Sequence, residues 1–296
     1  MPGAALLAML GVALLWGSAF PLIKVGLADL SVPHLTVARH LVASAAFLPV
    51  LSIAGARRLP ERRDVPVFLA LGFSGIFVYH TALNAGELRV SAGATSLIIA
   101  TAPAITASLA RLVHGERMPP GGWAGSAVAF LGVALIALGD AAGLRIEPYA
   151  GFVLLAAVAT SVYFVFQTGL LRRYRPVEAT AFVTWGGTVP MAAFLPGLPA
   201  DLAAASGAAL AATVYIGLFP SAVAYSLFAY AQARVPVGQV ASFLYAVPVV
   251  ALALSWAILG EVPRPLTLVG GGVAIAGIVI VQRARRRARA ALAALR

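Results

Sequence analysis

The chain has 296 residues, of which 61% are hydrophobic and only 10% are charged, and it contains no cysteine. About a quarter of the residues in a soluble domain are charged, so this composition excludes an ordinary soluble protein and indicates lipid as the main solvent. The missing cysteine excludes disulfides, thiolate metal sites and a cysteine nucleophile, while the net charge of +11 raises the question of a nucleic-acid partner.

Long apolar runs follow one another along the whole chain, each near the 20 residues that a helix needs to cross a bilayer. The first run has no basic start and is followed by a multispan pattern, so we interpret it as a span and not as a secretory signal. We therefore predict an all-α integral membrane protein. Its transmembrane helices, about ten in number, are expected at residues 5–24, 33–53, 66–85, 91–111, 121–139, 151–170, 178–197, 208–230, 237–258 and 265–282.

Arginine and lysine residues are unequally divided between the two sides that these spans define. With the N-terminus inside, sixteen of the 21 fall in cytoplasmic segments, six of them in the tail "QRARRRARAALAALR", and four fall outside. The positive-inside rule therefore predicts both termini in the cytoplasm. The basic tail, residues 284–296, is explained as an orientation signal that touches anionic lipid, so no nucleic-acid partner is expected.

The sequence repeats itself at an offset of 145 residues. The run "APAITASLARLVHGE" ends at Glu116, and "VPVVALALSWAILGE" ends at Glu261. Five further pairs match without a gap: Gly72 and Gly217, Arg89 and Arg234, Pro103 and Pro248, Gly125 and Gly270, Gly132 and Gly277. Each half holds five spans, an odd number, so the second half enters the membrane from the opposite side. We predict two inverted five-helix repeats, residues 1–140 and 141–283, around a central cavity.

Several segments resemble the drug/metabolite transporter superfamily. These are "LLWGSAFPLIKVGL" in the first span, "VARHLVASAAFLP" in the second, and the Pro-then-Gly-Glu endings of spans four and nine. The EamA-type ten-helix branch is the most similar, and the "VYH" of span three resembles YddG-like amino-acid exporters. The resemblance implies solute export across the inner (cytoplasmic) membrane of a bacterium, without an ATP-binding module.

Polar side chains recur at helical spacing inside the spans. In span three, Phe73, Phe77, His80 and Asn84 fall on one stripe of a regular helix, and Tyr225 occupies the repeat position of His80. Polar groups are costly in hydrocarbon, so we expect such stripes to line one central cavity. The candidate substrate-binding residues are Tyr79, His80, Asn84, Trp16, His40, Tyr163, Gln167, Tyr225 and Tyr245.

A packing explanation stands beside each of these assignments. Serine and threonine in membrane helices often bond to their own backbone or to a neighbouring helix, and Trp123 and Tyr149 fit an interfacial belt. Arg39 lies inside a span, where it either snorkels outward, pairs with Asp29 or Glu87, or contacts the substrate. Spans five and ten carry many glycines and almost no polar side chains, so we expect peripheral packing helices there.

Pro103 and Pro248 lie at repeat-related positions in spans four and nine. Proline lacks an amide hydrogen and crowds the preceding turn, so each should kink its helix. A matched pair of bends suits gating in alternating access, and simple packing geometry is the alternative.

The polar groups of the predicted cavity are hydroxyl, amide and aromatic, and no acidic residue falls clearly in mid-span. This set favours neutral amino acids, aromatic ones included, or similar metabolites over lipophilic cations. The alternatives are export of other metabolites or drugs, or an integral-membrane enzyme. No catalytic residue, cofactor or metal is expected. Besides the solute and membrane lipid the sequence names no partner, and a monomer is compatible with it.

Overall fold

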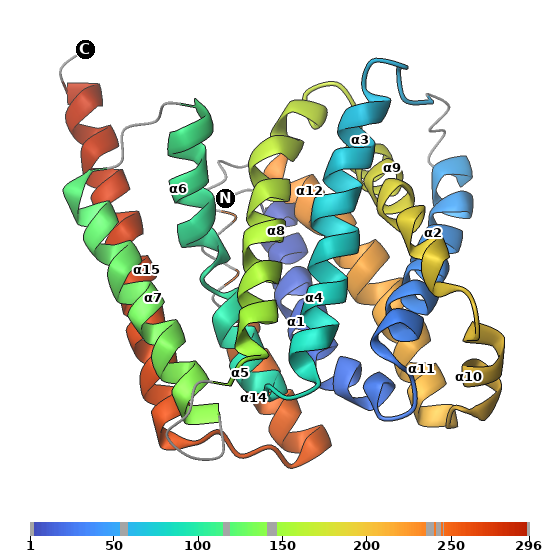
Figure 1. The fold of residues 1–296 in the computed structure, drawn as a ribbon. Coiled ribbons are helices and arrows are strands. Elements are labelled where there is room, and N and C mark those ends of the chain that lie inside the picture. The colour runs from blue at the N-terminus through green and yellow to red at the C-terminus, as the bar shows by residue number, and fades with distance from the viewer. Residues whose placement is uncertain are drawn as a thin grey trace.

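The protein is all-helical in the part of the chain that the structure describes, which confirms the predicted class (Figure 1). This computed structural model describes residues 3–53, 59–114, 119–140, 147–234, 240, 244 and 246–294. The elements of the first half are α1 (Gly3–Leu27), α2 (Val32–Ile53), α3 (Val65–Gly72), η1 (Phe73–Val78), α4 (Tyr79–Glu87), α5 (Ala92–Ile99), α6 (Ala102–His114) and α7 (Pro120–Asp140). Those of the second half are α8 (Ala150–Leu170), α9 (Pro176–Thr188), η2 (Pro190–Phe194), α10 (Leu198–Ala204), α11 (Gly207–Ile216), η3 (Gly217–Ala224), α12 (Tyr225–Gln232), α14 (Ala246–Leu259) and α15 (Pro265–Ala294).

Five helical runs are long and apolar enough to cross a membrane by length and composition: Gly3–Leu27, Val32–Ser52, Val65–Glu87, Ala150–Leu170 and Gly207–Gln232. Shorter apolar helices cover four of the other predicted spans, at Ala92–Thr106, Pro120–Ile136, Ala246–Leu259 and Pro265–Gly277. The predicted span at 178–197 coincides with α9 and η2. The structure thus supports a multi-pass membrane protein, while the count of ten spans stays a prediction.

Two π-helical segments lie at repeat-related positions. η1 covers Phe73–Val78 and η3 covers Gly217–Ala224, so the offset of 145 residues brings one onto the other. A π turn is wider than an α turn and changes which side chains share a face; such turns are frequent at functional sites. Tyr225 directly follows η3, and its repeat partner His80 is separated from the end of η1 by one residue, Tyr79.

The π segment η1 corrects the stripe predicted for span three. Phe73 is 51% exposed and stacks on Phe77 at 5.2 Å between ring centroids, and Phe77 stacks in turn on Phe194. His80 and Asn84 are buried instead. The regular-helix stripe is wrong because the wider turn rotates Phe73 to the surface while His80 faces the interior.

The fourth predicted span is interrupted. α5 ends at Ile99 and α6 begins at Ala102, so Pro103 lies in the first turn of α6, where its missing amide hydrogen breaks no helical bond. The sequence predicts a kink, and the structure shows a full break just before the proline, whose ring disfavours a continuous turn on that side. Pro248 likewise lies in the first turn of α14. Most of span nine before Pro248 falls outside the described residues.

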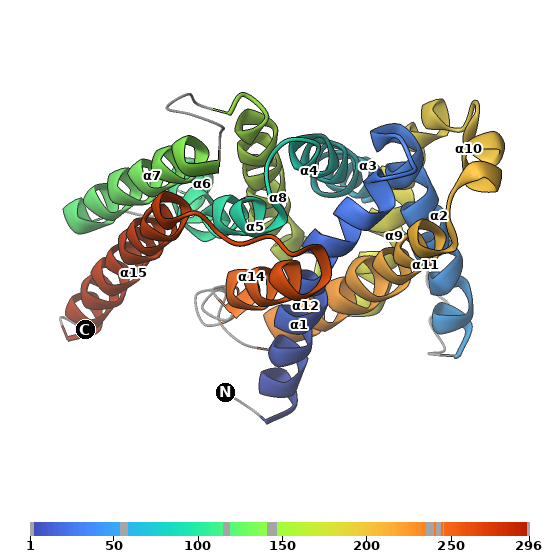
Figure 2. The ribbon, with the colours of Figure 1, turned by 90° about the horizontal axis from the view of Figure 1, so that it is seen from below.

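Helix contacts recur when the halves of the chain are exchanged. η1 and α4 pack on α8, and their counterparts η3 and α12 pack on α1. α3 and η1 lie against α9, and their counterparts α11 and η3 lie against α2. α7 runs along α15 at one edge of the molecule (Figures 1 and 2), where the glycine-rich spans five and ten predict peripheral packing helices. This pattern fits a two-repeat architecture.

Glycines permit the closest of these helix contacts. A Cβ on Gly132 would meet the backbone of Ala274, and a Cβ on Gly277 would meet the backbone of Ala129. The four positions form two pairs that the offset of 145 residues exchanges. Close backbone approach at small residues is the usual way in which membrane helices associate, because lipid supplies little hydrophobic force between them.

A polar cluster joins the two halves near the start of α3. The Asp64 carboxylate accepts a hydrogen bond of 2.7 Å from the Tyr174 hydroxyl and forms an ion pair of 2.7 Å with Arg173. The Tyr174 oxygen accepts in turn from the backbone N–H of Glu61. Hydrogen bonds from Tyr174, and to a smaller extent the Arg173 guanidinium, hold the pKa of Asp64 below its ordinary value.

This cluster predicts an acid-sensitive contribution to stability. A carboxyl with a lowered folded-state pKa stabilises the fold above its unfolded value, near 4, and loses that stabilisation as the pH falls through the folded value. The melting temperature of the parent should therefore drop more steeply below about pH 4 than that of Asp64→Asn, which lacks the titrating group. Equal pH profiles for the two proteins would show that Asp64 does not contribute through its charge.

Candidate functional site

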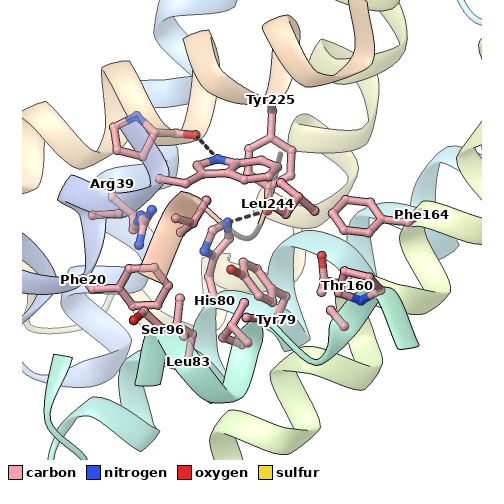
Figure 3. Close-up of a pocket in the computed structure, with 18 residues that line it drawn as sticks. Phe20, Arg39, Tyr79, His80, Leu83, Ser96, Thr160, Phe164, Tyr225 and Leu244 are labelled. Carbon is pink, nitrogen blue, oxygen red and sulfur yellow. Dashed lines mark hydrogen bonds between the residues drawn. The ribbon is translucent and has the colours of Figure 1, made fainter. Parts of the chain in front are cut away.

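A pocket lies in the interior at the break between α5 and α6, with about 650 Å³ of empty space that includes its open part (Figure 3). Side chains from both halves of the chain line it. They are Trp16, Ala19, Phe20, Arg39, Tyr79, His80, Leu83, Ser96, Ile99, Ala100, Ala102, Pro103, Thr160, Phe164, Pro220, Tyr225, Leu244 and Val247. The helix break thus opens directly onto the pocket, through Ala100, Ala102 and Pro103.

Four of the predicted substrate-binding residues line this pocket, namely Trp16, Tyr79, His80 and Tyr225. The Trp16 indole Nε1 donates a hydrogen bond of 3.1 Å to the Pro220 carbonyl oxygen, and its ring meets Tyr225 edge-on at 5.2 Å. The Tyr225 hydroxyl lies 3.5 Å from His80 Nε2. Figure 3 shows His80 between Arg39 on one side and Tyr79 on the other. The repeat-related pair His80 and Tyr225 therefore meets inside the pocket.

His40 and Asn84 are buried but are not among the lining residues. His40 Nδ1 donates to the Thr36 carbonyl oxygen at 2.8 Å, and its ring lies 4.4 Å from the ring of His80. The Asn84 amide donates to the Thr36 hydroxyl at 2.8 Å, which joins α4 to α2. His40 thus packs against His80, and Asn84 fixes α4, the helix that carries His80, to α2.

Tyr163 and Gln167 on α8 are also buried away from the lining. Tyr163 packs against Gly75 of η1, where a Cβ would lie 2.5 Å from the tyrosine ring. The Gln167 amide donates to the Gln232 side-chain oxygen at 2.6 Å and joins α8 to α12. Pro248 is buried next to the lining residue Val247, and Tyr245 lies outside the described residues.

Arg39 is the lining residue for which the sequence left the most alternatives open. Its side chain is 1% exposed, so it does not snorkel to a membrane surface. Its Nε and one terminal nitrogen donate to the Ser221 hydroxyl oxygen at 3.3 and 3.0 Å, and the other terminal nitrogen has no hydrogen-bond partner. Sequence reasoning left snorkelling open, and the signal that could have excluded it is the depth of Arg39 in α2, seven residues after Val32 or about 10 Å along the axis.

The remaining lining residues are mainly apolar or aromatic. Phe20 and Phe164 face the pocket from opposite sides in Figure 3, and Ser96 and Thr160 add hydroxyl groups. No acidic side chain lines this pocket. In the described part of the chain, no three His, Cys, Asp or Glu side chains gather in a way that could hold a metal ion. The site is therefore suited to binding a small solute with an apolar portion and a polar or anionic end.

Comparison with known proteins places both halves of the chain in one family. The EamA-like transporter family matches residues 3–138 and again residues 148–283. The chain is 43% identical over 268 residues to a "Probable terminal-alkyne amino-acid exporter" of Streptantibioticus cattleyicolor, covering 90% of each chain. It is 41% identical over 266 residues to "Uncharacterized transporter YdfC" of Bacillus subtilis, covering 89% of this chain and 86% of the relative. A solved crystal structure with 22% identity shares the fold, with a TM-score of 0.68 over 97% of this chain and 99% of that one.

Proposed function

This chain belongs to the EamA-like transporter family, and from that premise we propose that it is a secondary exporter of small neutral metabolites, most of all amino acids, aromatic ones included. The family and the relatives named as transporters indicate a transporter and not an enzyme. The relative named as an amino-acid exporter covers almost the whole chain, which supports amino acids as the substrate class and export as the direction.

The observation that carries the proposal is the interior pocket at the helix break. Its lining combines aromatic rings, among them Trp16, Phe164 and Tyr225, with the polar groups of His80, Tyr79 and Arg39. Aromatic rings with polar edges suit a solute that has an apolar side chain and a zwitterionic head. Pockets with an apolar lining and a few placed polar groups are typical of small-molecule sites. We propose that the four sequence candidates that line the pocket contact the substrate, namely Trp16, Tyr79, His80 and Tyr225.

We propose alternating access between two inverted five-helix repeats as the mechanism. Helices interrupted near the membrane centre, at a repeat interface, are the usual binding sites of such transporters. The break before Pro103 lies at the pocket, and Pro248 lies in the first turn of α14 at the repeat-related position. The first turns of α6 and α14 thus present positive helix ends toward the site. We propose Pro103 and Pro248 as the positions where the two gates bend.

In this arrangement ten spans cross the inner membrane, with both termini in the cytoplasm. The unequal division of arginine and lysine residues supports that orientation. A reporter that is active only in the cytoplasm should therefore be active when it is fused after Arg296. Activity of a reporter that works only in the periplasm, fused at the same position, would contradict the orientation and the inverted repeat together.

Counterflow in proteoliposomes tests the function. Vesicles that contain the purified protein and an excess of unlabelled phenylalanine or leucine should accumulate the labelled amino acid transiently, whereas protein-free vesicles should not. Export of other metabolites or drugs is the second candidate, and the same assay with such solutes tests it. If the protein is monodisperse but no neutral amino acid drives counterflow, the proposed substrate class is wrong.

A further inference from the structure

We infer that Arg39 is the receptor for the carboxylate of the transported solute, with Ser221 holding the guanidinium in position. The inference rests on the proposed function and deepens it, because it names the chemical group that a substrate must carry. Arg39 lines the pocket, is 1% exposed, and retains one terminal nitrogen without a hydrogen-bond partner.

Arg39 carries its charge in the interior of the protein. A guanidinium group cannot be deprotonated at neutral pH, and leaving a buried charge unpaired is strongly unfavourable. Among the described residues no carboxylate lies within ion-pair distance of Arg39, whose hydrogen-bond partner is the neutral Ser221 hydroxyl. A counter-ion is therefore missing on the pocket side, and a bound anionic group supplies it.

The role of Ser221 follows from its own hydrogen bonds. Its hydroxyl donates to the Ile216 carbonyl oxygen at 2.8 Å, five residues earlier, a spacing that belongs to the π-helical segment η3. Because that donor is used, the serine oxygen acts only as an acceptor toward Arg39. The π turn thus directs a fixed acceptor at two nitrogens of Arg39, which sets the plane of the guanidinium and leaves its free nitrogen for the solute.

Glu87 is a neighbouring acidic side chain and the alternative counter-ion for Arg39. It is 1% exposed, and it lies in α4, which packs against α2, the helix of Arg39. Neither Glu87 carboxyl oxygen has a hydrogen-bond partner, so the two side chains are not directly paired. Glu87 does not line the pocket either, whereas Arg39 does. In the alternative, Arg39 and Glu87 balance each other's charge at longer range, and the experiment must distinguish this from the binding of a solute carboxylate by Arg39.

The rest of the lining completes the substrate class. Trp16, Phe20, Phe164 and Tyr225 contribute aromatic rings to the lining of the pocket, and Phe20 lies on the same side as Arg39 in Figure 3. A carboxylate held by a guanidinium fork and an apolar side chain among aromatic rings describe an apolar or aromatic amino acid, or a related carboxylic acid. Amines that lack a carboxylate leave Arg39 unpaired, and they also bring a second positive charge to it. The site therefore selects against them.

Binding of four related probes to the purified protein tests this inference: phenylalanine, 3-phenylpropionate, phenylalanine amide and phenethylamine. The parent should bind the first two and should bind the amide and the amine about tenfold or more weakly, since a hydrogen bond between charged groups contributes that much. Arg39→Gln should bind phenylalanine about as weakly as the parent binds phenylalanine amide. Phe73→Ala, on the exposed face of the same membrane run as His80, serves as the control and should keep the discrimination of the parent.

Three outcomes would overturn the inference. The first is that a folded Arg39→Gln still prefers phenylalanine to its amide as strongly as the parent. The second is that Arg39→Gln does not fold, but Arg39→Gln combined with Glu87→Gln folds and keeps the full preference, which would assign Arg39 to charge balance. The third is that Ser221→Ala, which removes only the orienting hydroxyl, changes the preference by less than about twofold when a few-fold loss is expected. If no amino acid drives counterflow in the parent but 3-phenylpropionate binds through Arg39, the proposed function fails and the carboxylate site stands.

Discussion

Replacing Gly72 with valine is expected to lower the melting temperature of the protein strongly. Gly72 ends α3 where that helix crosses α9, and an added Cβ would lie 2.5 Å from the Val183 carbonyl oxygen and 2.6 Å from the Gly186 carbonyl carbon. Both are backbone atoms, which cannot rotate away as a flexible side chain does. Overpacking of this kind costs about 1–3 kcal/mol or more, and the crossing lies next to η1, which is followed directly by the pocket residues Tyr79 and His80.

The measurement is the melting temperature of the purified variant together with its monodisperse fraction. Gly169→Val is the matched control, because Gly169 is also helical, lies in α8, and has nothing within 4 Å of an added Cβ. Both variants carry the same cost of helix propensity, so the difference between them isolates the close helix crossing. Equal melting temperatures for the two variants would show that α3 and α9 do not approach as closely as the structure has them.

Removing the His80 side chain is expected to weaken transport at unchanged expression. His80 lines the pocket, its Nε2 lies 3.5 Å from the Tyr225 hydroxyl, and its Nδ1 has no hydrogen-bond partner. That nitrogen can exchange a hydrogen bond with a solute, and the loss of one such bond costs roughly 0.5–1.5 kcal/mol, or a few-fold to about tenfold in apparent affinity. His80→Ala and Tyr225→Ala should both lose that much in concentration-dependent counterflow.

His80→Gln keeps a donor and an acceptor and should recover part of the affinity. Phe73→Ala tests the same run of helix from its other face and should transport like the parent, because Phe73 is exposed. A regular helix would have put Phe73 and His80 on one stripe, so the contrast between these two variants also tests the π segment. If His80→Ala transports normally, the histidine has a packing role only.

The membrane class and the family could be predicted from the sequence, because they depend on features that no tertiary contact alters. Apolar runs such as the one at 151–170 form helices wherever lipid surrounds them, since every backbone polar group must be bonded within its own segment. The offset of 145 residues also brings η1 onto η3 and Pro103 onto Pro248, so the internal repeat predicted which segments would correspond in the structure. Polar and aromatic side chains within these apolar runs identified Trp16, Tyr79, His80 and Tyr225 as candidate residues.

The identity of the remaining pocket residues depended on the tertiary structure. Which way a side chain points depends on its rotation about the helix axis, and one π turn was enough to turn Phe73 outward while His80 faced inward. Whether a buried polar group faces a pocket or a neighbouring helix depends on partners far away in the sequence. Asn84 and Gln167 found such partners in Thr36 and Gln232.

The hydrogen-bond partner of Arg39 could not be predicted from the sequence either. Ser221, 182 residues away, accepts hydrogen bonds from two of its nitrogens, and the third has no hydrogen-bond partner. The composition of the sequence determined that the chain forms membrane helices, and its internal repeat determined that the two halves of the chain correspond. The packing of those helices decided which polar groups bond to one another and which have no hydrogen-bond partner in the protein, because hydrogen bonds reach only about 3 Å and depend on the final approach of the helices.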